Sequence, residues 1–311
     1  MPAPKLNVIK SKIITAIFQN YLKNKDIRTY KKKFTYFLIF RIIRKILTSN
    51  IVIEIYKFKI SCSTNKNSNS YYLLKKCEFG DYEEINTLTR FSNNHKILLI
   101  DCGCNYGFYT FHTASLSKNN RVISIEASNK TALDFLKNYN LNKLQNISFH
   151  NKAISDKDDL EVVFNESVND WESSLTHKNF RLKEEKNIKT CKIDTLLKSY
   201  NCEEFLIFIK LDIEGNEMKA LKGANLTIRR FAPIIIIEFS KFIFDNNENI
   251  NFLKNFMIEN NYNIYDTKKK QTNLEDIILN LNQLDDNHKT IGNYFLVKDS
   301  SKQLELFKKN G

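Results

Sequence analysis

Short apolar runs alternate with helix-like segments along most of this 311-residue chain. Strands are expected at 97–100, 121–127, 146–154, 205–212, 233–239, 262–266 and 292–298, and helices at 106–116, 129–142, 216–230 and 249–261. Repeated alternation of this kind predicts a mostly parallel sheet with helices on both faces. The last two strands have no clear helix between them, which predicts one antiparallel strand at the end of the sheet.

The positive charge of the chain is concentrated near its N-terminus. Residues 1–60 hold 14 Lys and Arg but only 2 Asp and Glu, and the whole chain has a net charge of +13. This asymmetry indicates a basic arm that meets an anionic surface, either a membrane or a polynucleotide, attached to a nearly neutral body. No apolar run approaches the length that spans a bilayer.

The chain is expected to divide into a basic amphipathic helical segment, a β-hairpin with a helix, the alternating domain and a tail, at 1–50, 51–95, 96–300 and 301–311. The helices of the first part either lie on anionic lipid or pack on the rest of the protein. The hairpin is expected to pair 51–63 with 71–79, and Asp81 then introduces a helix. The polar insertion 156–187, with Trp171, is either a lid over a ligand or a surface hairpin.

The six cysteines show no regular spacing, which is typical of reduced thiols in the cytoplasm. Cys102 and Cys104 lie one residue apart, but no His or Cys cluster accompanies them, so a zinc site is not expected. The lone histidines His112 and His150 are expected to be core residues rather than catalytic bases.

The segment Asp101-Cys-Gly-Cys-Asn-Tyr-Gly107 follows the first strand of the alternating region. In open α/β sheets a ligand binds beyond the carboxyl ends of the strands, and glycine lets the backbone approach it closely. Gly103 and Gly107 are therefore expected to turn main-chain amides towards a cofactor. Asn105 tolerates left-handed geometry or donates its amide, and Asp101 offers a carboxylate at the strand tip.

An acidic residue closes the next strand. Glu126 is placed to accept hydrogen bonds from both hydroxyls of a ribose. The glycine spacing does not fit the dehydrogenase pattern G-x-G-x-x-G, because Asn105 and Phe108 stand at its second and third glycine positions. These residues indicate a ribose-containing cofactor without identifying it.

A second unusual segment is Leu206–Ala224, with the sequence LIFIKLDIEGNEMKALKGA. Strand alternation places Lys210, Asp212 and Glu214 on one face, where burial would be costly unless these charges pair or face a ligand. Gly215 is expected to make a sharp turn into a helix, with Glu217 in its first turn.

Together, the glycine loop, Glu126, the Lys210–Ala224 segment and the following PIIIIEF strand resemble the FkbM family of S-adenosylmethionine-dependent methyltransferases. The resemblance covers about 78–239 and rests on D-x-G-x-N-x-G and K-x-D-x-E-G-x-E signatures in this order. It implies a class I methyltransferase fold, with a doubly wound, Rossmann-like, seven-stranded sheet. It also implies S-adenosylmethionine as cofactor and methyl transfer to a hydroxyl of a small molecule, sugar or glycan.

The resemblance also assigns roles to residues. It implies that the methionine half of the cofactor is held by four residues of the glycine loop: Asp101, Gly103, Asn105 and Gly107. It implies that Glu126 binds the ribose, that Asn151 and Ala153 lie near the adenine, and that Asp212 faces the sulfonium and the acceptor.

Methyl transfer from a sulfonium is an in-line displacement, which needs alignment and a group that accepts the hydroxyl proton. We expect Asp212 or Glu214 to orient or deprotonate the acceptor and Lys210 to set their charge state, with Glu238 a weaker candidate for acceptor contact. Asp212, Glu214 and Glu217 could gather a divalent cation, but charge pairing is the favoured interpretation and no metal is expected.

Two alternatives from other classes are considered. The basic arm could recruit a nucleic-acid methyltransferase, but no N-P-P-Y-like tetrapeptide follows the fourth strand, so nucleic acid is the less favoured partner. The fold could also serve as a catalytically silent scaffold. Under the favoured interpretation, residues 1–60 dock a cytoplasmic enzyme at the inner face of the membrane, near glycan acceptors.

Overall fold

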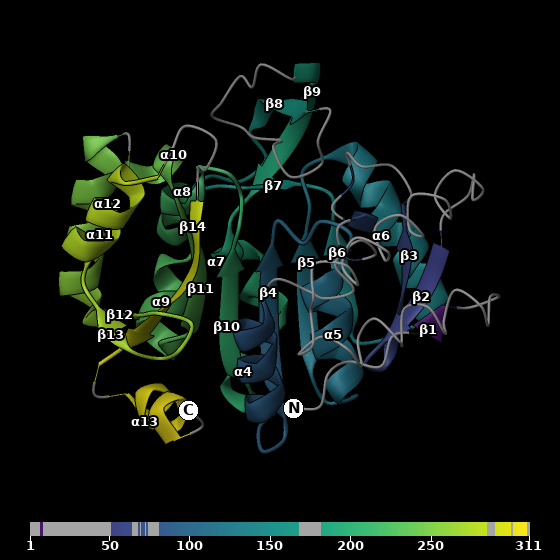
Figure 1. The fold of residues 1–311 in the computed structure, drawn as a ribbon, viewed down its shortest axis with the longest axis horizontal. Helices are drawn as coiled ribbons and strands as arrows, with labels where there is room; N and C mark the ends of the chain where they lie inside the picture. Colours follow the sequence, from purple (N-terminus) through teal and green to yellow (C-terminus); the bar gives the residue numbers. More distant parts are fainter. Residues whose placement is uncertain are drawn as a thin grey trace, which may run out of the picture.

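The computed structural model describes residues 7–8, 51–63, 68, 70–71, 73, 81–167, 182–244, 246–284, 290–299 and 301–309. Most of the expected N-terminal helical segment lies outside these residues. The described part is built around a central sheet that is flanked by helices (Figure 1). No helix in this part of the chain is both long and apolar enough to cross a membrane.

The central sheet has eight strands in the order β13-β12-β14-β11-β10-β4-β5-β6. From the β13 edge to the β6 edge they span Gln271–Thr272, Tyr262–Tyr265, Thr290–Lys298, Ile234–Ser240, Leu206–Leu211, Ile97–Cys102, Arg121–Ile125 and Ile147–His150. The five strands from β11 to β6 are parallel, and β14 is antiparallel to both β11 and β12. The expected antiparallel strand is thus present, and the two-residue β13 adds an eighth strand to the seven expected.

The helices cover both faces of this sheet. Each expected helix of the alternating region forms, and the structure adds α12 between the last two long strands. The main helices are α4 (Tyr82–Ser92), α5 (Phe108–Leu116), α6 (Asn129–Asn142), α8 (Glu217–Lys222), α9 (Asn225–Phe231), α11 (Asn247–Asn260), α12 (Leu274–Asn282) and α13 (Lys302–Lys309).

Each face of the sheet has its own hydrophobic core, because side chains alternate along a strand. On the face covered by α4, α5 and α13, which we call the α4 face, the sheet contributes Leu99, Phe208, Ile236 and Phe295. The opposite face packs on α8, α9, α11 and α12 and receives the neighbouring residues Leu98, Ile209, Ile235 and Leu296. Every second residue of these strands therefore points to the α4 face.

The N-terminal hairpin differs from the sequence expectation. Strands β2 (Ile51–Ile55) and β3 (Phe58–Cys62) pair with each other through a two-residue turn in which Tyr56 has a φ of 53°. Tyr71 and Leu73, expected in the second strand, are helical instead. Pairing across the short turn satisfies the backbone groups of 51–62 locally, so the segment after residue 70 is not needed as a strand.

A two-residue strand, β1 (Asn7–Val8), pairs with β2 and lies in a segment that was expected to be helical. That expectation is therefore wrong for Asn7 and Val8, whose backbone groups extend the hairpin sheet by one short antiparallel strand. Residues 1–6 and 9–50 lie outside the described residues.

The expected strand 146–154 is broken in two. β6 belongs to the central sheet, but β7 (Ala153–Ile154) leaves it to pair with β9 (Leu182–Cys191). β9 also pairs antiparallel with β8 (Glu161–Ser167), so the insertion forms a hairpin sheet beside the main one (Figure 1). The described residues of the insertion thus form a hairpin, and its role as a lid, which the sequence favoured slightly, stays a prediction. Trp171 and its neighbours lie outside the described residues.

The expected helix 216–230 is divided into α8 and α9 at Gly223. A Cβ at this position would collide with the carbonyl oxygen of Ser155, so the chain between the two helices is pressed against the loop after β7. The backbone of Gly223 also accepts a hydrogen bond from Asp194 N at 3.0 Å. This close contact accounts for the break.

The expected tail at 301–311 contains helix α13, which packs on the sheet. Phe307 is fully buried, with its ring centroid 5.4 Å from that of Tyr265 and 5.1 Å from that of Phe295. An apolar side chain of this size stabilises the α4 face by about 2–3 kcal/mol through burial. The segment is therefore part of the core.

His112 is a core residue, as expected. Its side chain is buried on α5, and Nε2 lies 2.8 Å from Oγ1 of Thr89, whose hydroxyl donates to the carbonyl of Ile85 at 2.9 Å. The Thr89 proton is used in that bond, so Nε2 of a neutral His112 ring donates to Oγ1. Burial lowers the pKa of His112 to about 3, and the nearby backbone of Ile85 only partly offsets this effect.

Acid should destabilise the fold through His112. The folded-state pKa lies below the ordinary value, so the unfolded chain binds the extra proton. This contribution to stability is full above about pH 6.5 and is lost as the pH falls towards 3. Between neutral pH and about pH 5, wild type should lose about 2 kcal/mol more than His112→Phe, as measured by urea unfolding. Equal losses of stability in the two proteins would contradict the lowered pKa of His112. His150 is present in both proteins, so its titration cancels in the comparison.

Candidate active site

Polar side chains gather at one end of four neighbouring strands, all on the α4 face: the carboxyl ends of β4, β10 and β11 and the amino end of the antiparallel β14. Asp101 ends β4 and lies opposite Lys210 of β10, while Glu238 of β11 lies opposite Asn293 of β14. Lys210 of β10 lies opposite Ile236 of β11. Asp212 and Glu238 each follow two residues later, so they lie at the same level of the sheet. The sequence-predicted residues Asp101, Lys210 and Asp212 are thus brought together.

Lys210 and Asp212 form a close ion pair, with Nζ and Oδ2 2.6 Å apart. The Lys210 side chain is only 3% exposed, and its ammonium lies 4.7 Å from the ring centroid of Tyr109. Burial alone would lower the pKa of Lys210, but the carboxylates of Asp212, Asp101 and Asp81 outweigh it and raise the pKa above its ordinary value. Lys210 therefore stays charged, and the expected charge pairing is present.

The carboxylates around this pair differ from the set considered for a cation. Glu217 turns back towards its own backbone and accepts from the amides of Ile213 at 3.1 Å and Gly215 at 3.0 Å. The third carboxylate beside Asp212 and Glu214 is instead Glu238. It offers an oxygen atom within 4.8 Å of a carboxylate oxygen of each of these two residues. Burial, and then Asp212, raise the pKa of Glu238. Three carboxylates are thus close together, although one of them is paired with Lys210.

The glycine loop is pressed against the tip of β10. Gly103 has a φ of 77°, and a Cβ there would collide with the carbonyl oxygen of Asp212. Gly107 has a φ of 95°, and a Cβ there would collide with the ring of Phe111. Asn105 is left-handed, with a φ of 51°, as the sequence allowed. The two glycines are required by both conformation and space.

Glu126 is joined to the same loop. Its carboxylate accepts from the backbone amides of Asn105 at 2.9 Å and Ser128 at 2.8 Å. Burial raises the pKa of Glu126 to about 7 in spite of these two bonds. Asn151 donates its side-chain amide to the carbonyl of Glu126 at 2.8 Å, which ties the loops after β5 and β6 together. The residues expected to hold a ribose and to lie near an adenine are therefore neighbours.

Ala153 lies in a small apolar cluster next to these loops, with Phe164 of β8 and Ile188 of β9, and Ala127 packs against it. The insertion is also held by Glu166, which accepts from the hydroxyl of Ser128 at 2.9 Å. The sequence around Phe164 and Glu166 does not indicate that these residues reach the end of β5. They lie there because β8 pairs with β9, which in turn pairs with β7.

Asp101 provides a test of whether this region fits a cationic ligand. It is 1% exposed, and its Oδ2 accepts from the hydroxyl of Thr110 at 2.7 Å. Its Oδ1 is also buried and has no hydrogen-bond partner among the described residues. An unsatisfied buried carboxylate oxygen costs about 1–3 kcal/mol or more, which a donor from a bound ligand would offset. The glycine cradle and this oxygen both fit the ammonium group of a methionine-like cofactor.

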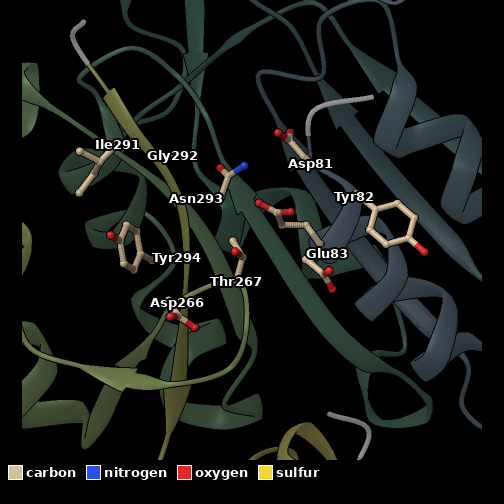
Figure 2. Close-up of a pocket in the computed structure, with 10 residues that line it drawn as sticks. Asp81, Tyr82, Glu83, Asp266, Thr267, Ile291, Gly292, Asn293 and Tyr294 are labelled. Carbon is tan, nitrogen blue, oxygen red and sulfur yellow. The ribbon is translucent and has the colours of Figure 1, made fainter. Parts of the chain in front are cut away.

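A pocket of about 340 Å³ opens on the same face, between the start of α4 and the start of β14 (Figure 2). Sequence reasoning did not identify it, and treated Asp81 only as the residue that introduces a helix. Asp81 instead accepts a hydrogen bond from the hydroxyl of Tyr109 at 2.9 Å. Tyr109 thus links the pocket to Lys210. The sequence signal for this pocket was the polar Asn293, which interrupts a run of mostly apolar residues in β14.

Comparison with known proteins identifies the family. Residues 101–264 match the methyltransferase FkbM domain, which is more than half of the chain. The chain belongs to the FkbM methyltransferase family. The class I methyltransferase fold and the S-adenosylmethionine cofactor that the sequence implied are those of this family. No curated protein sequence matches the chain significantly.

Solved structures with similar folds include three methyltransferases. Methyltransferase FkbM from Methylobacillus flagellatus KT has 18% identity and a TM-score of 0.40, over 89% of this chain and 60% of its own. An O-methyltransferase from Bacillus cereus in complex with SAH has 16% identity and a TM-score of 0.38, over 70% and 80%. A putative rRNA methylase from Clostridium thermocellum has 13% identity and a TM-score of 0.38, over 68% and 92%. The chain thus spans less than two thirds of the first of these.

Replacement of Gly103 tests the contact between the glycine loop and β10. Gly103→Ala should lower the free energy of unfolding by about 1–3 kcal/mol more than Gly292→Ala, because only the first adds a collision to the strain of a positive φ. Gly292 is a matched control, since it has a φ of 102° and a Cβ added there would have no heavy atom within 4 Å. The measurement is denaturant unfolding, with cofactor titration of Gly103→Ala alongside. If the two variants were equally destabilised, the loop would not be packed against Asp212.

Proposed function

We propose that this FkbM-family methyltransferase transfers a methyl group from S-adenosylmethionine to a hydroxyl of a small molecule, sugar or glycan. The observation that carries the proposal is the buried Lys210–Asp212 pair, which lies at the tip of β10 directly against the glycine loop. An acceptor that reaches Asp212 is then next to the loop that holds the methionine half of the cofactor.

The bound cofactor supplies an electrophilic methyl group on a sulfonium. The backbone of Gly103 and Gly107 and the carboxylates of Asp101 and Glu126 hold and orient it at the ends of β4 and β5. Asp212 is 34% exposed while its partner Lys210 is buried, so the carboxylate is the member of the pair that can meet an acceptor. In the proposed reaction it would orient the acceptor hydroxyl and take its proton, while the methyl group that the cofactor would supply leaves the sulfonium sulfur and bonds to the hydroxyl oxygen.

Lys210 acts on this chemistry through Asp212. Its ammonium donates a hydrogen bond to Oδ2 of Asp212 at 2.6 Å and so fixes the orientation of that carboxylate. Glu214 has a φ of 52° and is held next to Asp212 by the sharp turn at Gly215, which has a φ of 101°. We assign to Glu214 the orientation of the acceptor rather than the transfer of its proton. The basic arm at 1–60 would bring the enzyme to an anionic membrane surface, and liposome co-sedimentation of the full chain and of a truncated chain tests that part of the proposal.

The overall proposal is tested by incubating the protein with a cell extract and S-adenosylmethionine labelled in its methyl group. The fraction that acquires the label is then identified, and the labelled bond is located by its stability to base and by mass spectrometry. Label in an ether bond of a small molecule or glycan supports the proposal. Label in nucleic acid would refute it, and so would the absence of label combined with the absence of cofactor binding.

Asp212→Asn should separate catalysis from cofactor binding. The amide keeps the shape of the carboxylate but does not accept a proton, so kcat is expected to fall by about 10²–10⁴-fold, with the affinity for S-adenosylmethionine nearly unchanged. Asp134→Asn, which removes a surface carboxylate of α6 paired with Lys137, is the matched control and should retain full activity. Full turnover of Asp212→Asn would rule out its role as the proton acceptor.

A further inference from the structure

The pocket beside α4 has an unusual charge pattern. Its ten lining residues include four carboxylic acids and no lysine, arginine or histidine; the acids are Asp81, Glu83, Glu84 and Asp266. Figure 2 shows residues of α4 on one side and residues of β14 and the loop after β12 on the other. A volume of about 340 Å³ lies at the lower end of the range for small-molecule sites, roughly 300–1,000 Å³.

The pocket adjoins the proposed point of methyl transfer. Asn293, which lines it, lies opposite Glu238 in the sheet, and Glu238 is close to Asp212. On the other side, Asp81 receives a hydrogen bond from Tyr109, whose ring lies beneath the ammonium of Lys210. Two lining residues of the pocket, Asn293 and Asp81, are thus each one residue away from the Lys210–Asp212 pair.

Glu84 is buried and Asp81 is partly buried, and neither forms an ion pair of its own with a lysine, arginine or histidine among the described residues. Glu84 is 4% exposed, and both Glu84 and Asp81 are hydrogen-bonded to the side chain of Asn293. Burial raises the pKa of both groups, to about 7 for Glu84. Lys210 also attracts them, but its ammonium is committed to Asp212 at 2.6 Å. The Oδ1 atom of Asn293 is buried and lacks a partner among the described residues.

We propose that this pocket binds a protonated amine of the methyl acceptor, so that the substrate class is an amino sugar or a similar amino alcohol. The proposal rests on the proposed function, since it names the acceptor of that reaction. An ammonium group carries three donors and a positive charge, which match the carboxylates of Asp81 and Glu84.

Other acceptor classes fit these walls less well. A neutral polyol would bury the two carboxyl groups further without a counter-charge, which is costly. An anionic acceptor would be repelled by all four acids. A protonated amine also has no lone pair, so it is not itself methylated. The neighbouring hydroxyl takes the methyl group and its proton passes to Asp212, which agrees with oxygen methylation.

Binding of matched probes tests the proposal apart from catalysis. D-glucosamine and D-glucose differ only in an amine against a hydroxyl, and D-glucuronate adds a negative charge. Each is titrated by calorimetry or ligand-observed NMR into the full chain at neutral pH and low salt, in the presence of S-adenosylhomocysteine. D-glucosamine is expected to bind at least about tenfold more tightly than D-glucose, as for one added charge-assisted hydrogen bond, and D-glucuronate more weakly than either.

Substitutions in the pocket test which residues cause the preference for D-glucosamine over D-glucose. Glu84→Gln and Asp81→Asn should each remove most of the preference for D-glucosamine over D-glucose, so that the two sugars bind about equally, while the affinity for S-adenosylhomocysteine stays unchanged. Glu83→Gln, at an exposed position of the same pocket, should give a smaller reduction in a variant whose fold is not at risk. Glu248→Gln, at an exposed position of α11, is the control and should leave the preference intact.

The outcomes separate the two proposals. If D-glucose bound as tightly as D-glucosamine, if no probe bound a protein that binds the cofactor product, or if the preference survived in all three pocket variants, the amine site would be refuted and the methyltransferase function would stand. If S-adenosylhomocysteine and S-adenosylmethionine themselves failed to bind, the proposed function would fall, and the amine site with it.

Discussion

The active site depends on one buried ammonium group. Lys210 lies in the centre of the sheet, and the negative charges that surround it come from the ends of β4 and β10 and from the start of α4. The desolvation of such a group would be prohibitive without partners, and the removal of one member of a buried ion pair typically costs about 3–5 kcal/mol. Asp212 in particular is fixed by this requirement, because its side chain is the direct partner of the ammonium and its carbonyl touches the glycine loop. The charge balance around Lys210 and the position of the glycine loop therefore depend on the same few residues.

The proximity of the glycine loop to Glu126 could be predicted from sequence because its determinants are local. The apolar run of β4, the glycines that follow it and Glu126 at the end of β5 lie within 30 residues of one another, and each strand tip in a parallel sheet points to the same edge. The helix 129–142 was predicted with the bounds that the structure gives. Its N-cap Ser128 and its amphipathic pattern are features of the segment itself.

The errors arose where a distant contact overrides a local pattern. Residues 71–79 were expected to complete a hairpin that in fact closes at Tyr56, a residue type without the usual preference for a positive φ. The run 146–154 reads as one strand, but the pairing of β7 with β9 draws its second half out of the sheet. The acidic pocket has no sequence signature, because Glu84 and Asn293 come from opposite ends of the domain and neither belongs to a motif. Glu217 was considered as a possible metal ligand, but its backbone hydrogen bonds account for it.

The position of β14 in the sheet affects the order in which parts of the proposed site fold. This strand is inserted between β11 and β12, yet it follows both of them in the chain, and its partner across the pocket, α4, precedes β4. Loop-closure entropy makes contacts between such distant segments slow to form, whereas the cradle around Gly103 and Glu126 uses neighbouring ones. In the proposed site, we therefore expect the cradle around Gly103 and Glu126 to form earlier in folding than the pocket between α4 and β14. The same separation predicts that substitutions in α4 or β14 change the acceptor preference without changing the affinity for the cofactor.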